Sequence, residues 1–314
     1  LAKRTKKSSL FYAIPLLAGL AVGHAFIPPT PGPVLVATML NVELGWVILV
    51  GILCGTVAMI VAGPVFGAFC GKKYNIAIPE HVASQADFDE SKLPSFGTIV
   101  GIIMIPLVLI ILDSLAGVIP AMAPLSGVLG FLGEPFVALL IATVVAMYLL
   151  GTRHGYSNEE LEKVMTKSLE PTGLILLVTA SGGVLRYMLQ YSGLGEVIGN
   201  AVASAALPMV VVAFIVAALV RISVGSATVA MTMAAGIVAA MPGIAELSPL
   251  YLACVTAAVA GGATVCSHFN DSGFWLVKSL IGMDEKTTLK TWTIMETLVG
   301  GTGFLVALII SFFA

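Results

Sequence analysis

Long runs without a charged residue dominate this sequence. Asp, Glu, Lys, Arg and His are all absent from residues 44–71, 135–152, 197–220, 222–245, 247–267 and 297–314. A helix rises 1.5 Å per residue, so about 20 apolar residues cross a bilayer core about 30 Å thick. With the shorter apolar runs, these stretches predict an all-α polytopic membrane protein of about eight to eleven membrane segments, some of them broken.

The charge balance excludes several other classes of protein. Only 10% of the 314 residues are charged, and the formal net charge is -2. No basic excess is available to bind phosphates, so we expect no nucleic-acid partner. The four cysteines lie in apolar stretches without C-x-x-C spacing, so we expect neither a disulfide framework nor a metal site. The lipid bilayer is the partner that composition indicates, and nothing implies a cofactor.

Polar stretches divide the chain into two predicted membrane parts. Residues 72–97 carry most of the charges of the first third and form a loop long enough to connect two units. We therefore predict that residues 1–71 are the remainder of a first membrane repeat and that residues 98–314 form a second one. Residues 153–170, rich in Glu and Lys, are expected to lie at the surface of this second repeat.

A weak internal similarity accompanies this division. Trp46 follows His24 at nearly the same spacing as Trp292 follows His268. Two such matches can arise by chance, but internal repeats are common in secondary transporters. If the repeat is real, its first copy is incomplete, because much less apolar sequence precedes His24 than precedes His268.

A proline-rich stretch marks the first predicted break in a membrane helix. Residues 28–33 contain four prolines, and such a sequence is expected not to be helical. Irregular backbone at membrane depth must line a cavity or be buried in protein. We therefore take Pro31 and Gly32 as candidate substrate-binding residues. An ordinary loop at the membrane surface is the alternative.

An isolated arginine marks the second predicted break. Arg221 separates two long uncharged runs, residues 197–220 and 222–245. Such an arginine is costly in a membrane unless it faces water, a partner or an anionic ligand. On a helix, Arg221, Gly225 and Thr228 share one face, and Ser226 begins a stripe of small residues. These four residues are candidate substrate-binding residues, although an arginine that reaches the lipid headgroups from a helix end is also possible.

A polar cluster marks the third predicted break, at residues 267–275. Asn, Asp and Ser in succession favour a helix start, which would be an ordinary cap at the membrane surface. Inside the bilayer, the same start would offer free N–H groups and a positive dipole end to a carboxylate. The candidate substrate-binding residues here are Ser267, Asn270, Ser272 and Gly273.

Four titratable residues near these breaks are candidate proton carriers. His24 and His268 can change charge near neutral pH, and Asp271 and Glu296 are carboxyl groups within or beside apolar runs. No H-E-x-x-H or G-x-S-x-G pattern is present, so an intramembrane enzyme is the least favoured alternative and we assign no catalytic residue.

Four segments together resemble the gluconate permease family of bacterial secondary transporters. They are residues 24–33, 221–228, 267–276 and 289–297, in the family's order. The resemblance covers nearly the whole chain. It implies a multi-pass protein of the bacterial cytoplasmic (inner) membrane that carries gluconate or a related small hydroxy or sugar acid with a proton, by alternating access.

The resemblance also has architectural implications. The family is similar to the larger ion transporter superfamily, which implies an inverted-repeat secondary transporter with re-entrant hairpins, acting as a homodimer. Family members carry several more membrane segments before the position that matches His24. The resemblance therefore implies that part of the first repeat is missing from this chain.

The expected mechanism joins these observations. We expect Arg221 or a helix N-terminus to neutralise the substrate carboxylate, while hydroxyl and amide side chains of the breaks contact the substrate hydroxyls. This requires the three breaks to meet at one cavity. A sodium-coupled carboxylate carrier or a channel would use the same groups, and the sequence leaves these alternatives open.

Overall fold

Every regular element that the structure describes is a helix. The computed structural model describes residues 2–5, 7–74, 76, 93–192 and 207–314, and no β-strand occurs among them. Five of these helical segments are long and apolar enough to cross a membrane: Leu10–Leu40, Leu44–Lys73, Phe96–Asp113, Pro135–His154 and Glu285–Ser311. The prediction of an all-α polytopic membrane protein is confirmed.

The chain forms two compact units. The first contains Leu1–Val42, Trp46–Gln85 and Thr179–Ala314, and the second contains Glu43–Gly45 and Ala86–Val178. These units follow contacts in space and do not test the predicted repeat boundaries, which stay a prediction. Most of the predicted connecting loop at residues 72–97 lies outside the described residues.

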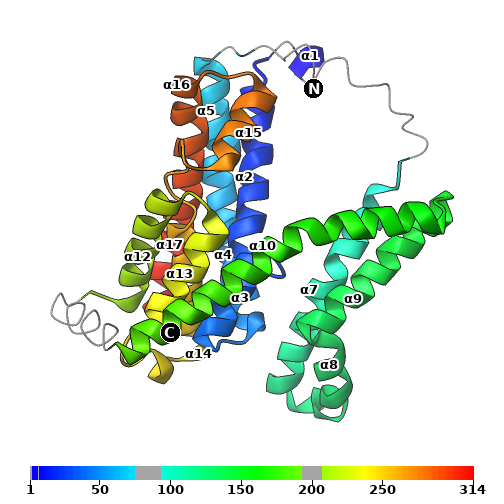
Figure 1. Cartoon of the computed structure of the whole chain (residues 1–314), viewed down its shortest axis with the longest axis vertical. Helices are drawn as coiled ribbons and strands as arrows, with labels where there is room; N and C mark the ends of the chain where they lie inside the picture. The colour runs from blue at the N-terminus through cyan, green and yellow to red at the C-terminus, as the bar shows by residue number, and fades with distance from the viewer. Residues whose placement is uncertain (1, 6, 75, 77–92, 193–206) are drawn as a thin grey trace. The chain divides into compact units, whose positions relative to one another are not determined.

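The first unit is a bundle of long and short helices (Figure 1). Its elements are α1 (Ala2–Thr5), α2 (Leu10–Phe26), α3 (Pro31–Leu40), α4 (Leu44–Ile60), η1 (Val61–Val65), α5 (Phe66–Lys73), α12 (Met209–Val224), α13 (Ala227–Ala239), η6 (Ile244–Glu246), α14 (Pro249–Gly262), α15 (Ser272–Ile281), α16 (Glu285–Thr288), η7 (Leu289–Thr293) and α17 (Ile294–Ser311). Figure 1 shows α15 and α16 at the end of the bundle where α2 begins and α5 ends.

Four apolar helices of this unit are too short to cross a membrane alone. They are α12, α13, α14 and α15, with 16, 13, 14 and 10 residues. Helices α12 and α13 pack against each other after a sharp turn, which is the arrangement expected of a hairpin. The breaks predicted at Arg221–Thr228 and at residues 267–275 are present as interruptions between helices. The break predicted at residues 28–33 is shorter than expected, because α3 already begins at Pro31. Proline fits the first position of a helix, where its missing N–H needs no partner.

Glycine allows α14 to pack closely on both of its neighbours. A Cβ on Gly300 of α17 would lie 2.2 Å from the carbonyl oxygen of Gly261, and one on Gly262 would lie 2.3 Å from that of Phe214 on α12. Small residues at such contacts let helix backbones approach each other, which is how membrane helices associate. Helix α14 therefore forms the buried centre of the unit and fixes where α12 and α17 lie.

The second unit contains α7 (Phe96–Val118), η3 (Pro120–Leu125), α8 (Ser126–Gly133), α9 (Pro135–Ala146), η4 (Met147–Gly151), η5 (Thr152–His154) and the first part of α10 (Asn158–Tyr191). At the start of α10, Ser157 Oγ accepts from the N–H of Glu160 (3.3 Å), and Glu160 Oε2 accepts from the N–H of Ser157 (2.8 Å). This reciprocal cap lowers the pKa of the Glu160 carboxyl, chiefly through the backbone hydrogen bond.

Helix α10 contains most of the expected surface segment at residues 153–170 and extends beyond it. The helix does not end there but continues through Pro171 to Tyr191. A proline inside a helix removes one hydrogen bond and bends it without always ending it, and the apolar residues that follow extend the helix. The polar stretch and the next apolar run are thus one helix of 34 residues.

Candidate functional site

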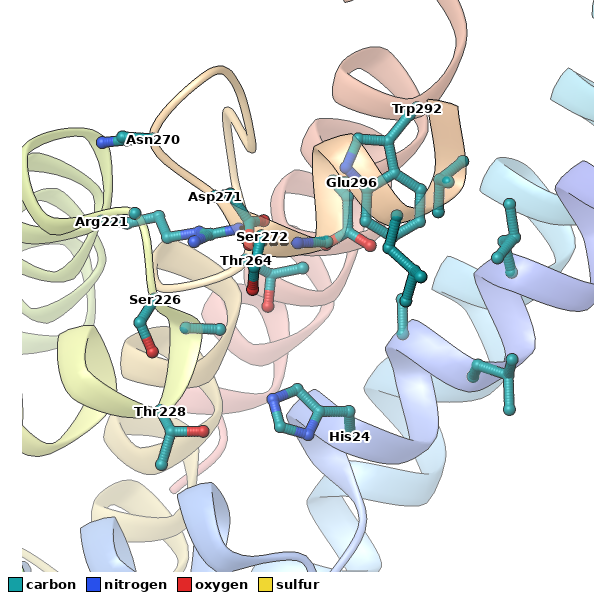
Figure 2. A pocket seen from close by; sticks show the side chains of 18 of the residues that line it. His24, Arg221, Ser226, Thr228, Thr264, Asn270, Asp271, Ser272, Trp292 and Glu296 are labelled. Carbon is teal, nitrogen blue, oxygen red and sulfur yellow. Dashed lines mark hydrogen bonds and ion pairs between the residues drawn. The ribbon is translucent and has the colours of Figure 1, made fainter. Parts of the chain in front are cut away.

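A cavity of about 520 Å³ lies within the first unit, where the interrupted helices meet (Figure 2). The volume is in the range of small-molecule binding sites, about 300–1,000 Å³. Its lining residues come from α2, from the α12–α13 turn, from the segment between α14 and α15 and from α17: they include His24, Arg221, Gly225, Ser226, Thr228, Thr264, Asn270, Asp271, Ser272, Gly273, Trp292 and Glu296. Figure 2 shows Ser226 and Thr228 on one side of the cavity, and Trp292 and Glu296 on the other.

The turn between α12 and α13 requires glycine. Gly225 ends α12 with a φ of +83°, a left-handed conformation that is easy for glycine and costly for other residues. A Cβ at this position would lie 2.2 Å from the carbonyl oxygen of Asn270. Asn270 in turn donates from Nδ2 to the carbonyl of Ile222 (2.8 Å). The second and third breaks are therefore in direct contact.

A buried ion pair joins the same two segments. Arg221 Nη2 lies 2.5 Å from Asp271 Oδ2, and the exposed fractions of the two side chains are 3% and 13%. Each charge is at the favourable end of a helix, since Arg221 is in the last turn of α12 and Asp271 caps the first turn of α15. Asp271 Oδ1 accepts from the N–H of Gly273 (2.9 Å).

Two nitrogen atoms of Arg221 have no hydrogen-bond partner among the described residues. They are Nε and Nη1, and both are buried. A buried donor without a partner costs about 1–3 kcal/mol, and more when it is charged. Because Arg221 lines the cavity, these atoms are suited to bind an anion that enters it.

The segment between α14 and α15 is held by η7, the helical turn that precedes α17. Trp292 Nε1 donates to Ser267 Oγ (2.7 Å), Ser267 Oγ donates to Asp271 Oδ2, and Thr293 Oγ1 donates to the Ser267 carbonyl. Trp292 and Thr293 belong to the π-helical turn η7, a feature that is frequent at functional sites. The tryptophan therefore reaches the ion pair through one serine.

Two further titratable side chains line the cavity. Glu296 of α17 is only 6% exposed, and no ion pair to it is formed by the described residues. His24, in the last turn of α2, is exposed and faces the cavity. Together with Arg221 and Asp271, they are the ionisable groups among the described lining residues.

The structure brings together most of the residues predicted from sequence. Those that line the cavity are His24, Arg221, Gly225, Ser226, Thr228, Asn270, Asp271, Ser272, Gly273 and Glu296. The sequence predicted that all three breaks meet at one cavity. The second and third breaks do, whereas Pro31 and Gly32 of the first break do not line it. Whether these residues bind substrate or carry protons stays a prediction.

Four predicted residues do not line the cavity. Pro31 is exposed at the start of α3, and Gly32 packs against Met231 of α13. Ser267 is buried beneath the cavity and acts through its hydrogen bond to Asp271. His268 contributes its carbonyl, which accepts from the N–H of Asp271 (2.9 Å).

Sequence reasoning missed two polar residues of the lining. Thr264 lies in an uncharged run, and its hydroxyl donates to the Ala260 carbonyl (2.8 Å), as threonines do in ordinary helices. Trp292 drew attention only through the internal similarity and the family resemblance. The hydrogen bond from Trp292 to Ser267, 25 residues away in sequence, depends on tertiary contacts that no local pattern reveals.

Comparisons with known proteins identify the family of the chain. Residues 1–313 match the family model described as GntP family permease. The low-affinity gluconate transporter of Escherichia coli K12 is 40% identical over 312 residues, which are 98% of this chain and 69% of that protein. A gluconate permease of Pseudomonas aeruginosa is 34% identical (99% and 69%), and the Gnt-II system L-idonate transporter of Escherichia coli K12 is 34% identical (96% and 68%). The chain therefore belongs to the GntP family of permeases, multi-pass proteins of the bacterial cytoplasmic membrane that are transporters and not enzymes.

Proposed function

We propose that the protein is a proton-coupled symporter for gluconate or a related sugar acid. Relatives that share 34–40% of its residues are named as transporters of gluconate and L-idonate. Both compounds combine one carboxylate with several hydroxyl groups. The observation that carries the proposal is the buried Arg221, two of whose nitrogen atoms have no hydrogen-bond partner among the described residues. It lies in a cavity lined by hydroxyl, amide and apolar groups together with Asp271, Glu296 and His24.

Arg221 is the proposed carboxylate-binding residue. A guanidinium offers donors in a fixed planar fork that matches the two oxygens of a carboxylate. The cavity is largely withdrawn from water at this residue, which strengthens the attraction between the two charges. The first turn of α15, beginning at Ser272, adds backbone N–H groups and the positive end of a helix dipole.

The substrate hydroxyls are assigned to the polar side chains around this point. Ser226 and Thr228 approach from the α12–α13 turn, and Thr264, Asn270 and Ser272 approach from the segment that joins α14 to α15. Hydroxyl side chains both donate and accept, so they suit a chain of substrate hydroxyls without requiring one fixed pattern. Such a site favours sugar acids over apolar carboxylates, which would leave these groups unpaired.

Proton coupling and alternating access are part of the proposal. The carboxyl groups of Asp271 and Glu296 and the imidazole of His24 face the cavity and are the candidate carriers of the coupling proton, which is the only cofactor that we propose. The four short apolar helices resemble the interrupted helices that form the substrate site in many secondary transporters, in which one repeat or bundle moves against the other. The homodimer and the inverted repeats implied by the resemblance are proposed for this chain as well.

Uptake by proteoliposomes tests the proposed function. The protein, expressed from its complete reading frame, is reconstituted in sodium-free vesicles with labelled gluconate outside. We expect an imposed inward proton gradient to drive accumulation and unlabelled gluconate inside to accelerate exchange. Accumulation that requires an inward sodium gradient would contradict proton coupling, and flux that does not saturate would contradict a carrier.

A further inference from the structure

We propose that the substrate carboxylate replaces Asp271 as the counter-ion of Arg221, and that the released Asp271 takes up the coupling proton. This inference rests on the proposed function and adds the step that links the anion to the proton. Arg221 binds the substrate carboxylate and Asp271 binds the proton. Because the two residues contact each other, the binding of substrate and the binding of the proton are coupled.

The geometry of the ion pair leaves room for such an exchange. Asp271 contacts the guanidinium through one pair of atoms, Oδ2 and Nη2, while Nε and Nη1 of Arg221 have no partner in the described part of the chain. Both edges of the guanidinium that can form two parallel hydrogen bonds include Nη2, with either Nε or Nη1 as the second donor. A substrate carboxylate bound along either edge therefore takes the place of Asp271 and forms two hydrogen bonds to the fork, which is stronger than a single contact. The substrate therefore competes favourably with Asp271 for Arg221.

Asp271 remains in place without the arginine. Its Oδ1 accepts from the N–H of Gly273, and its Oδ2 accepts from Ser267 Oγ. Ser267 is itself held by the indole of Trp292 and by the hydroxyl of Thr293. The carboxyl group can therefore lose its cation without leaving the cavity.

Charge balance then requires a proton. The charges of Arg221 and Asp271 sum to zero, and the substrate adds one negative charge. A second unbalanced carboxylate beside this pair, whose side chains are only 3% and 13% exposed, is costly. One proton, taken from the side on which the substrate enters, converts the Asp271 carboxylate to the neutral acid and restores the balance.

Two other ionisable groups line the described part of this cavity. Glu296 faces it from α17 and His24 from α2. Neither forms an ion pair or hydrogen bond with Arg221, so the entry of a carboxylate does not remove a counter-ion from either residue. Among the titratable groups of the described lining, Asp271 is therefore the one that loses its counter-ion when a carboxylate binds Arg221.

Gluconate binding to purified protein tests the exchange. Titration calorimetry compares the wild type with Asp271→Asn from about pH 6 to about pH 9, a range that spans physiological titrations. For the wild type, we expect affinity to fall as pH rises, by up to about tenfold per pH unit, because binding takes up one proton. For Asp271→Asn, we expect affinity to be independent of pH and higher than that of the wild type at the alkaline end, because no charge competes for Arg221.

Glu246 offers a matched control for the loss of one carboxyl group. Glu246→Gln removes an exposed carboxyl group outside the cavity and should retain the wild-type pH dependence. Asp271→Asn protein that binds gluconate less tightly at every pH, or with the wild-type pH dependence, would overturn the exchange. In vesicles, Asp271→Asn should retain gluconate exchange and lose proton-driven accumulation. Failure of the wild type to bind any sugar acid would instead contradict the proposed function itself.

Discussion

Arg221 and Asp271 are 50 residues apart in sequence, yet their side chains meet at 2.5 Å between the end of α12 and the start of α15. Arg221 is in the last turn of α12, and Asp271 is the N-terminal cap of α15. Each residue therefore lies beside an interruption between helices. The pair therefore joins two interrupted segments and places a cation with free donors at the wall of a cavity.

Arg221→Lys should lower gluconate affinity by at least about tenfold. Lysine keeps the charge but lacks the planar fork, so it cannot hold a substrate carboxylate through two parallel hydrogen bonds. Thermal shift titrated with gluconate measures the affinity. Arg153→Lys, at an exposed position on η5, is the matched control and should bind as the wild type does. Equal affinity of the Arg221→Lys and wild-type proteins would remove the arginine from the site.

Gly225→Ala should abolish uptake. The added Cβ would lie 2.2 Å from the Asn270 carbonyl oxygen and would separate the two segments that form the cavity. Gly243→Ala is a close control, because Gly243 has a similar φ of +77° with nothing within 4 Å of the new Cβ. The unfolding free energy of that variant should fall by only about 1 kcal/mol, which is the cost of a left-handed backbone for alanine. Similar uptake by both variants would show that the contact with Asn270 is dispensable.

Gly300→Ala should destabilise the first unit by about 1–3 kcal/mol, because its Cβ would press on the backbone of α14. At the next residue, Gly301, a Cβ would meet nothing within 4 Å. Gly301→Ala should therefore leave stability unchanged or raise it by up to about 1 kcal/mol, as alanine favours a helix. Thermal unfolding in detergent compares the two. A larger loss for Gly301→Ala would be inconsistent with the packing of α14 on α17.

Trp292→Phe should weaken gluconate binding and lower the unfolding free energy by about 1 kcal/mol. Phenylalanine keeps an aromatic side chain but is smaller than tryptophan and lacks the N–H that holds Ser267, so Asp271 loses part of its support. Trp46→Phe, on α4 and outside the cavity, is the control. Binding and unfolding are measured on the same preparations. If both variants bind equally well, the indole N–H has no role in positioning Asp271.

The sequence was most informative where a polar residue interrupts an apolar run. Burying Arg221 or the polar cluster around Asn270 in a membrane costs free energy unless these groups have partners or face a cavity. The structure places both at one cavity. Pro31 and Gly32 illustrate the limit of this reasoning. Their break exists, but Gly32 packs on Met231 instead of facing the cavity, because close helix packing also favours small residues.

The remaining features depend on tertiary contacts. No spacing predicts that Arg221 pairs with Asp271, or that Ser267 lies beneath the site and not in its wall. The π-helical turn η7, which lets Trp292 and Thr293 contact the same serine, has no reliable local signature. The continuity of α10 through Pro171 likewise arises from the apolar residues that follow the proline.

The balanced charges of Arg221 and Asp271 have an electrical consequence. Moving one elementary charge through a membrane potential of 100 mV involves about 2.3 kcal/mol of work. A cation and an anion that move together contribute none, so under the proposed alternating access the membrane potential neither assists nor opposes the movement of these two groups in the unloaded protein.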